Sequence, residues 1–85
     1  MSRTAKLVKS FLSNPPEASF SDVEYLLRAF EFEEVRSSGS HHIFRHEDGR
    51  MQIVPKKHGQ KVKGAYIKQI VKLLRLEEWY DQEED

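Results

Sequence analysis

Histidines are the side chains best suited to chemistry in this 85-residue chain. Three of the four, His41, His42 and His46, lie close together, and His58 follows in a basic segment. Because the pKa of an unperturbed histidine is ~6.5, such a side chain can accept or return a proton near neutral pH. The chain contains no cysteine, which excludes disulfides, thiolate catalysis and zinc-ribbon sites. Proton transfer by histidine is therefore the first chemistry to consider.

Four interpretations of the segment that contains these histidines compete. A metal site would require them to converge, but adjacent histidines on a strand point to opposite faces, and no acid lies at a known ligand spacing. A serine nucleophile is disfavoured, because Ser37, Ser38 and Ser40 belong to no nucleophile elbow and no phosphate-binding loop. The remaining two are a site that cleaves phosphodiester bonds and a set of surface histidines without chemistry.

A protein that cleaves RNA need not supply the nucleophile, because RNA carries its own, the 2′-hydroxyl. A base, an acid and positive charge are sufficient, and general acid–base catalysis contributes typically ~10²–10⁴-fold. Basic side chains that could bind phosphate and stabilise developing charge are Arg45, Arg50, Lys56, Lys57 and Lys61. Such a site requires no metal ion and no other cofactor.

Charge is unevenly distributed along the chain, although the net charge is zero. Residues 36–75 carry ten basic and two acidic side chains, whereas residues 76–85 carry six acids and no base. The basic segment predicts a positive surface for a phosphate backbone or an acidic partner. The acidic tail either folds over that surface or keeps the protein soluble.

Two helices are predicted before the histidines. Apolar residues at helical spacing predict a helix over residues 4–12, which Asn14-Pro15-Pro16 ends. A capping box that begins at Ser21 predicts a second helix, with an apolar face that reaches Phe30.

Three strands and one helix are predicted for the rest of the chain. A short strand over residues 32–35 precedes a hairpin, whose strands are residues 40–46 and 50–54. A basic loop then leads to a helix over residues 65–76. The order α, α, β, β, β, α predicts an α+β domain with helices on one sheet face and the other face open to a ligand. No apolar run is long enough to span a bilayer, so we expect a soluble intracellular protein.

Several of these features occur together in residues 39–74, GSHHIFRHEDGRMQIVPKKHGQKVKGAYIKQIVKLL. Gly39-Ser40-His41 opens a strand, a hairpin follows, and Val54-Pro55 precedes a basic stretch and a closing amphipathic helix. In this combination the chain resembles the HicA toxin family of bacterial and archaeal toxin–antitoxin pairs, over roughly residues 20–76.

The resemblance implies a double-stranded-RNA-binding-domain-like fold with an α-β-β-β-α core in residues 20–76. Residues 1–19 would form a helical extension and residues 77–85 an acidic tail. It also implies a ribosome-independent mRNA interferase of the cytoplasm, masked by a HicB antitoxin. The family's catalytic histidine follows Gly-Ser, which is His41 here. His42 is the nearest competitor, because a one-residue difference in strand register would exchange their faces.

The chain departs from the common family pattern in three ways. Glu31 stands where a glycine usually ends the second helix, and a non-glycine residue must avoid or tolerate a left-handed cap at roughly 1 kcal/mol. Glu47 stands where proline is frequent. The N-terminal helix and the acidic tail exceed the compact family core.

The predicted function is a toxin-type endoribonuclease that cleaves mRNA or other single-stranded RNA, with His41 as catalytic residue and a HicB-like antitoxin as partner. Neither a metal nor a membrane is expected to take part. The alternatives are a non-catalytic RNA-binding module of the same fold and a protein-interaction domain with a basic surface. The predicted RNA-binding residues are Gly39, Ser40, Arg45, Arg50, Lys56, Lys57 and Lys61.

Overall fold

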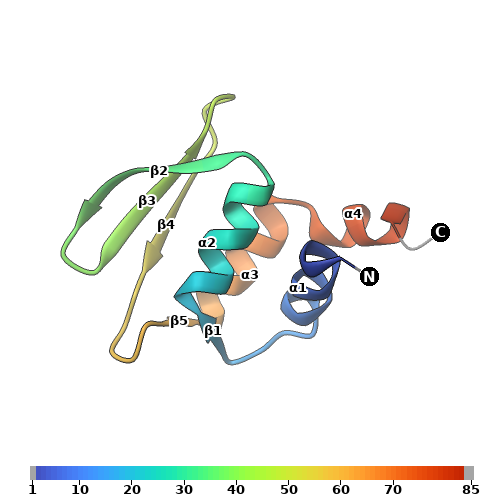
Figure 1. The fold of residues 1–85 in the computed structure, drawn as a ribbon, viewed down its shortest axis with the longest axis horizontal. Helices are drawn as coiled ribbons and strands as arrows, with labels where there is room; N and C mark the ends of the chain where they lie inside the picture. Colours follow the sequence, from blue (N-terminus) through green and yellow to red (C-terminus); the bar gives the residue numbers. More distant parts are fainter. Residues whose placement is uncertain (1, 84–85) are drawn as a thin grey trace.

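The computed structural model describes residues 2–83, in which most strands lie between two pairs of helices in the sequence (Figure 1). The elements are α1 (Arg3–Leu12), β1 (Glu17–Ser19), α2 (Phe20–Ala29), β2 (Phe32–Ser38), β3 (His41–His46), β4 (Met51–Pro55), β5 (Lys61–Lys63), α3 (Gly64–Leu73) and α4 (Leu76–Glu83). None of the helices in this part of the chain combines the length and the apolar character needed to cross a membrane.

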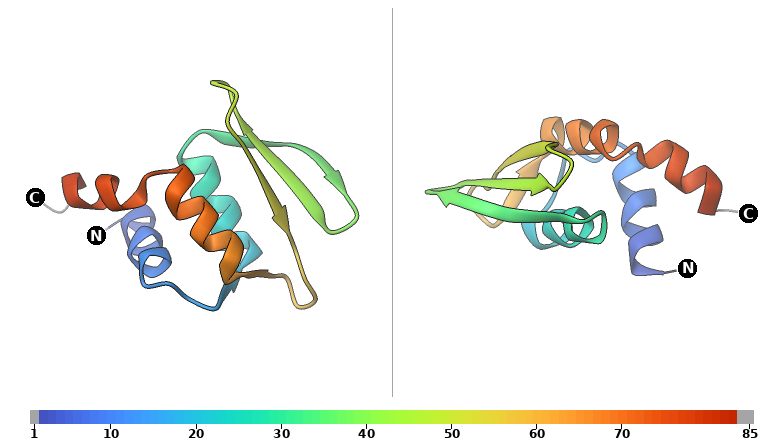
Figure 2. Two further views of the ribbon diagram at one scale, coloured as in Figure 1. Left: turned by 180° about the vertical axis from the view of Figure 1, so that it is seen from behind. Right: turned by 90° about the horizontal axis from the view of Figure 1, so that it is seen from above.

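The elements lie in three layers (Figures 1 and 2). The antiparallel sheet β2-β3-β4 is one layer, and α2 and α3 cover one of its faces. Helices α1 and α4 lie beyond α2 and α3, on the side away from the sheet. No described helix covers the opposite face of the sheet. The α+β class and the open sheet face predicted from the sequence are therefore confirmed.

The register of the three-stranded sheet determines which side chains face the helices. Phe44 of β3 lies opposite Glu34 of β2 and Gln52 of β4, whereas His41 lies opposite Ser38 and Pro55. A β-bulge interrupts the pairing of β2 between Glu34 and Arg36. Because Phe44 is fully buried, the residues that share its parity on β3 also point toward the helices.

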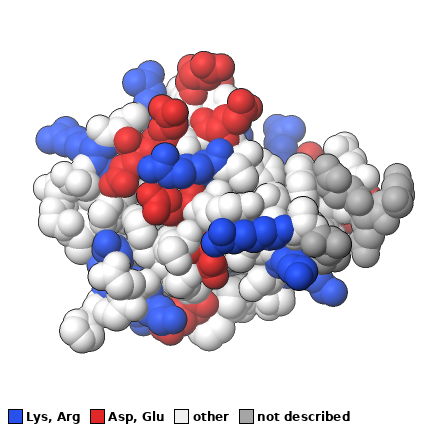
Figure 3. Space-filling model, in the orientation of Figure 1, with Lys and Arg blue, Asp and Glu red and all other residues white. Residues whose placement is uncertain are grey.

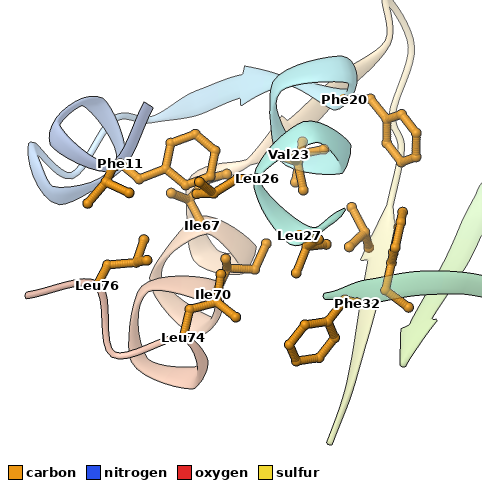
Figure 4. Close-up of a cluster of buried hydrophobic side chains, with 14 residues drawn as sticks. Phe11, Phe20, Val23, Leu26, Leu27, Phe32, Ile67, Ile70, Leu74 and Leu76 are labelled. Atoms are coloured by element: carbon orange, nitrogen blue, oxygen red, sulfur yellow. The ribbon is translucent and has the colours of Figure 1, made fainter. Parts of the chain in front are cut away.

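The hydrophobic core lies between the sheet and the helices and continues toward α1 and α4 (Figure 4). Phe32, Phe44 and Val54 supply the sheet side, and each is fully buried. The fully buried helical residues of the same core include Leu26, Leu27 and Ile70. Burial of a side chain of this size contributes about 1.5–3 kcal/mol to the free energy of unfolding.

The structure corrects the predicted organisation in two places. Strands β1 and β5 were not predicted, and they pair antiparallel, with Glu17 opposite Lys63 and Ser19 opposite Lys61. The start of α2 also differs, because its N-cap is Ser19 rather than Ser21. The Ser19 hydroxyl accepts a hydrogen bond from the backbone N–H of Asp22 at 3.2 Å.

The predicted helix over residues 65–76 is wrong at its end. Helix α3 stops at Leu73, and Arg75 adopts a left-handed conformation with φ of 52° before α4 begins. The acidic tail is thus helical as far as Glu83. Leu76 is buried, and the Trp79 ring packs edge-on against Phe30 with centroids 5.7 Å apart. Helix α4 lies beside α1 and the end of α3, away from the sheet, and does not cover the basic loop before α3 (Figure 2). Glu84 and Asp85 lie outside the described residues.

Gly64 begins α3 where the chain before β1 approaches it closely. Its N–H donates to the carbonyl oxygen of Pro16 at 2.8 Å, and an added Cβ would lie 2.6 Å from the carbonyl oxygen of Pro15. We expect Gly64→Ala to lower the free energy of unfolding by about 1–3 kcal/mol, because backbone must shift. Urea denaturation measures the loss. Gly59→Ala is the control, since its Cβ would meet only Lys61 at 3.9 Å and it adds only the strain of a φ of 82°. Wild-type stability of Gly64→Ala would contradict this close approach.

Glu31 tolerates the left-handed conformation that the sequence comparison anticipated, with φ of 69°. A left-handed conformation at a non-glycine residue lowers the free energy of unfolding by roughly 1–2 kcal/mol. Glycine removes this strain, but it also raises the conformational entropy of the unfolded chain, which offsets part of the gain. We therefore expect Glu31→Gly to raise the melting temperature, by roughly 4–8 °C for each kcal/mol gained. Glu33→Gly in β2 is the matched control and should lower it. A fall in melting temperature for both variants would disprove the account of Glu31.

Candidate functional site

Four of the predicted site residues meet at one corner of the sheet, which we call the histidine corner: Gly39, Ser40, His41 and Lys56, together with His42. Gly39 turns the chain from β2 into β3 with φ of 59°. The backbone N–H of Lys56, just after β4, donates to the Ser40 carbonyl oxygen at 2.7 Å. The β3–β4 pairing thus brings a lysine beside the Gly-Ser-His segment.

The two adjacent histidines of this corner have different surroundings. His41 is exposed and lies on the sheet face that the helices leave open. His42 shares the parity of Phe44, faces the helices, and has only 13% of its side chain exposed. The alternation predicted for the strand is therefore confirmed, and it gives the two histidines unequal chemistry.

His42 is held by a carboxylate. Its Nδ1 atom lies 2.6 Å from the Oε2 atom of Glu34, a half-buried residue of β2. Because an ionised carboxylate only accepts hydrogen bonds, a hydrogen bond between these two atoms would use an N–H at Nδ1. The other ring nitrogen, Nε2, is buried and has no hydrogen-bond partner among the described residues. A neutral His42 would therefore carry its lone pair on Nε2.

Phe20 and Lys56 complete the surroundings of His42. The Phe20 ring, at the start of α2, lies 4.6 Å from the imidazole between centroids. The Nζ atom of Lys56 lies 4.6 Å from the centroid of the same Phe20 ring. Phe20 thus contacts both an imidazole and an ammonium group, and a histidine with a cation in the same region is a combination that proton transfer at a phosphodiester can use.

Lys57 lies in the loop between β4 and β5, and Lys61 is the first residue of β5. Their backbones pair, with the N–H of Lys57 donating to the Lys61 carbonyl oxygen at 2.8 Å. The Nζ atom of Lys57 lies 2.9 Å from Oε1 of Glu17. This hydrogen bond and the lysine charge lower the pKa of Glu17. The charge of Lys57 is therefore shared with an acid of the protein itself.

The two predicted arginines lie away from the histidine corner. Arg45 lies opposite Glu33 and Met51 on the open sheet face. Arg50 follows the turn at the far end of β3, where its Nε atom donates to Asp48 at 2.8 Å. Another guanidinium N–H donates to the Leu73 carbonyl oxygen at the end of α3, at 3.2 Å. Arg50 thus ties the hairpin to a helix end.

Asp48 is fixed by the same arginine. The backbone N–H of Arg50 donates to its carboxylate, and this bond is the main cause of a lowered pKa for Asp48. His46 also belongs to this end of the hairpin, with Nδ1 3.1 Å from Oδ1 of Asp48. The histidine cluster of the sequence is therefore divided between two ends of β3. No group of three or more potential metal ligands occurs within residues 2–83.

Basic and acidic side chains are interleaved on the face that Figure 3 shows. The basic segment was expected to form a positive surface, but acids from earlier segments lie beside it, such as Glu17 at Lys57 and Glu33 opposite Arg45. A summed charge along the sequence therefore overstates the positive charge at any one place.

Sequence reasoning missed Glu34 and Phe20 as neighbours of the histidines. From the sequence, Phe20 is recognised only as an apolar residue that precedes the second helix. The parity of Glu34 relative to β3 depends on the bulge after it, which no local pattern indicates. The single sequence signal that placed His42 and His41 on opposite faces of the sheet was the alternation of side-chain direction along β3.

Comparison with known proteins identifies one family. The family model described as the HicA toxin of bacterial toxin–antitoxin systems matches residues 20–76, about two thirds of the chain. The matched segment begins at α2 and ends at the start of α4, and it includes the whole histidine corner. Comparisons with curated proteins and with solved structures gave no significant match.

The contacts of Arg50 predict a structural effect of its removal. Arg50→Ala should lower the free energy of unfolding by about 1 kcal/mol, since hydrogen bonds to Asp48 and to the end of α3 are lost and half-exposed groups are partly screened. Arg45→Ala, on the open sheet face, should change it by less than about 0.5 kcal/mol. Urea denaturation of both variants tests this difference. Equal stability of the two would show that Arg50 does not tie the hairpin to α3.

Proposed function

Because the chain belongs to the HicA toxin family of bacterial toxin–antitoxin systems, we propose that it is an endoribonuclease that cleaves RNA by histidine acid–base catalysis without a metal ion. The observation that carries the proposal is the His42–Glu34 pair at the histidine corner, with Lys56 nearby. In this proposal Glu34 orients His42 as the base, Lys56 supplies positive charge, and water serves as the acid.

The choice between the two histidines follows from their surroundings. The family resemblance assigned catalysis to His41, which is exposed and has no side-chain hydrogen bond among the described contacts. His42 has the carboxylate that a general base uses to hold its tautomer. We therefore propose His42 for the proton transfer and keep His41 as the alternative that the experiment below must separate.

The proposed step requires no group beyond RNA, protein and water. Nε2 of His42 takes the proton of the 2′-hydroxyl, and the 2′-oxygen forms a bond to phosphorus at the same time. The bond from phosphorus to the 5′-oxygen breaks, and that oxygen takes a proton from water. The hydroxide that remains takes the proton held by His42, which restores water and the neutral histidine. The products are a 2′,3′-cyclic phosphate and a 5′-hydroxyl. Lys56 would stabilise the negative charge that develops on the phosphate oxygens.

Fold and partner complete the proposal. Apart from the short strand β5 before α3, the order α2, β2, β3, β4, α3 matches the α-β-β-β-α core of a double-stranded-RNA-binding-domain-like fold, which supports that assignment. We propose mRNA or other single-stranded RNA as the substrate and a HicB-like antitoxin as the cytoplasmic partner that masks the corner. Helix α4 leaves the corner uncovered, so masking by the described part of the acidic tail is not part of the proposal.

One observation favours a second candidate, a protein of this fold that binds RNA without cleaving it. The Nε2 atom of His42 is buried, so RNA can reach it only if a neighbouring side chain moves. If this movement never occurs, the protein would still bind RNA through its fold and basic residues, but it would not cleave RNA.

Cleavage of a labelled single-stranded RNA in the presence of EDTA tests the proposal. We expect the wild type to cut and to leave 2′,3′-cyclic phosphate ends. His42→Ala should reduce the rate by ~10²–10⁴-fold, the typical contribution of acid–base catalysis. His41→Ala, the matched control on the adjacent position, should remain within several-fold of the wild type. Circular dichroism must show that both variants are folded.

Other outcomes assign the function differently. Loss of cleavage in His41→Ala alone would return the catalytic role to His41. RNA binding without cleavage by the wild type would establish the second candidate. Cleavage that stops when EDTA is added would rule out the metal-free mechanism.

A further inference from the structure

We propose that Glu34 is a positioning residue, which holds the proton of His42 on Nδ1 and presents Nε2 as the reacting nitrogen. The inference rests on the proposed function and extends it to a residue of another strand. Glu34 does not itself contact RNA in this proposal. It acts through the imidazole of His42.

The sheet geometry explains how the carboxylate reaches the ring. Glu34 lies opposite Phe44, and His42 lies opposite Ser37, so Glu34 and His42 are diagonal neighbours on the same face. Diagonal neighbours in a sheet are about 7–8 Å apart, within reach of a long side chain. The bulge that follows Glu34 makes it the last regularly paired residue before the strand changes its pairing. A bulge next to such a pair is a common means of aiming a side chain.

The pair is shielded from water. The side chain of His42 is 13% exposed and that of Glu34 is 22% exposed, and their atoms approach to 2.6 Å. A charge-assisted hydrogen bond in such surroundings is stronger than the same bond at an exposed site. The ordinary competitor of the bond, solvent, is therefore largely excluded.

Among the described residues, no side chain other than Glu34 forms a hydrogen bond with the ring of His42. Helix α2 contributes the ring of Phe20, and the segment after β4 contributes Lys56, which is a cation. Phe20 against one side of the imidazole also limits rotation of the ring. Among the described residues Nε2 has no partner, so Glu34 is the one group that determines which nitrogen carries the proton.

A purely structural ion pair would share this geometry, but it predicts different behaviour. Removal of a structural pair lowers stability and leaves the chemical step unchanged in the protein that remains folded. Removal of a positioning residue changes the tautomer of His42 and lowers kcat while KM stays nearly constant. The tautomer and the split between kcat and KM therefore distinguish the two roles.

The experiment uses the full chain and two readouts. Long-range ¹H–¹⁵N correlation spectra of the histidine rings report which nitrogen of His42 carries the proton. Single-stranded RNA cleavage in EDTA gives kcat and KM. Glu34→Ala removes the acceptor, and Glu34→Gln keeps the volume but not the charge. Glu33→Ala is the matched control, because Glu33 precedes it on β2 and lies opposite Arg45 on the open face.

We expect the Nδ1–H tautomer of His42 in the wild type and in Glu33→Ala, and a mixture with Nε2–H in both Glu34 variants. Glu34→Ala should lower kcat by at least about 10-fold, with KM within about twofold; loss of the orienting carboxylate reaches ~10⁴ in a Ser-His-Asp triad. Glu34→Gln, which keeps the fold most closely, should fall between Glu34→Ala and the wild type.

Three results would overturn the inference. One is an Nε2–H tautomer in the wild type. Another is a tautomer unchanged in both Glu34 variants, and the third is a kcat for them equal to that of Glu33→Ala. A wild type that holds His42 as Nδ1–H but never cleaves RNA overturns the proposed function and the catalytic use of the pair. The spectra would still establish that Glu34 orients the ring, so the two failures are distinguishable.

Discussion

Alternation of side chains along β3, combined with a sheet that is covered on one face, determines most of what the site can do. Phe44 is fully buried against the helices, and this requires His42 to face inward and His41 to face outward. Two residues of the same type, adjacent in sequence, thereby receive different environments. One is shielded and bonded to a carboxylate, and the other lies in solvent. A reversed parity would place Phe44 in water, at a cost of about 1.5–3 kcal/mol for its exposure.

The bulge in β2 is the second constraint, because it separates two pairing patterns within one strand. Up to Glu34 the inward residues of β2 follow Phe32, which is fully buried. After the bulge Ser37 lies opposite His42, and Val35 is 57% exposed. A serine directly opposite leaves room beside the imidazole, and the longer Glu34 side chain fills it diagonally. The position of the carboxylate thus depends on an irregularity of the strand as well as on its regular pairing.

Sequence patterns predicted the parts of this fold that are regular and long. Helical spacing identified α1, α2 and most of α3, and the turn residues 47–49 identified the β3–β4 hairpin. Strands β1 and β5 have three residues each, too few for a period to be visible, and their pairing depends on the close approach at Gly64. Residues 77–85 are predicted as a charged tail because acids dominate this segment, although Trp79 and Tyr80 pack against the core.

The site shows the same difference between features that follow from local sequence and features that depend on pairing between distant segments. Gly39, Ser40 and His41 are contiguous, so sequence alone placed them together, but Lys56 joins them only through β-pairing. Lys57 and Arg50 are bound to acids of the protein, whereas the charge of Lys56 rests on the ring of Phe20. The carboxylates beside Lys57 and Arg50 partly neutralise the charge that an incoming phosphate would meet there. The aromatic ring beside Lys56 carries no net charge, so attraction at the corner depends on that one lysine more than on the charge summed over the segment.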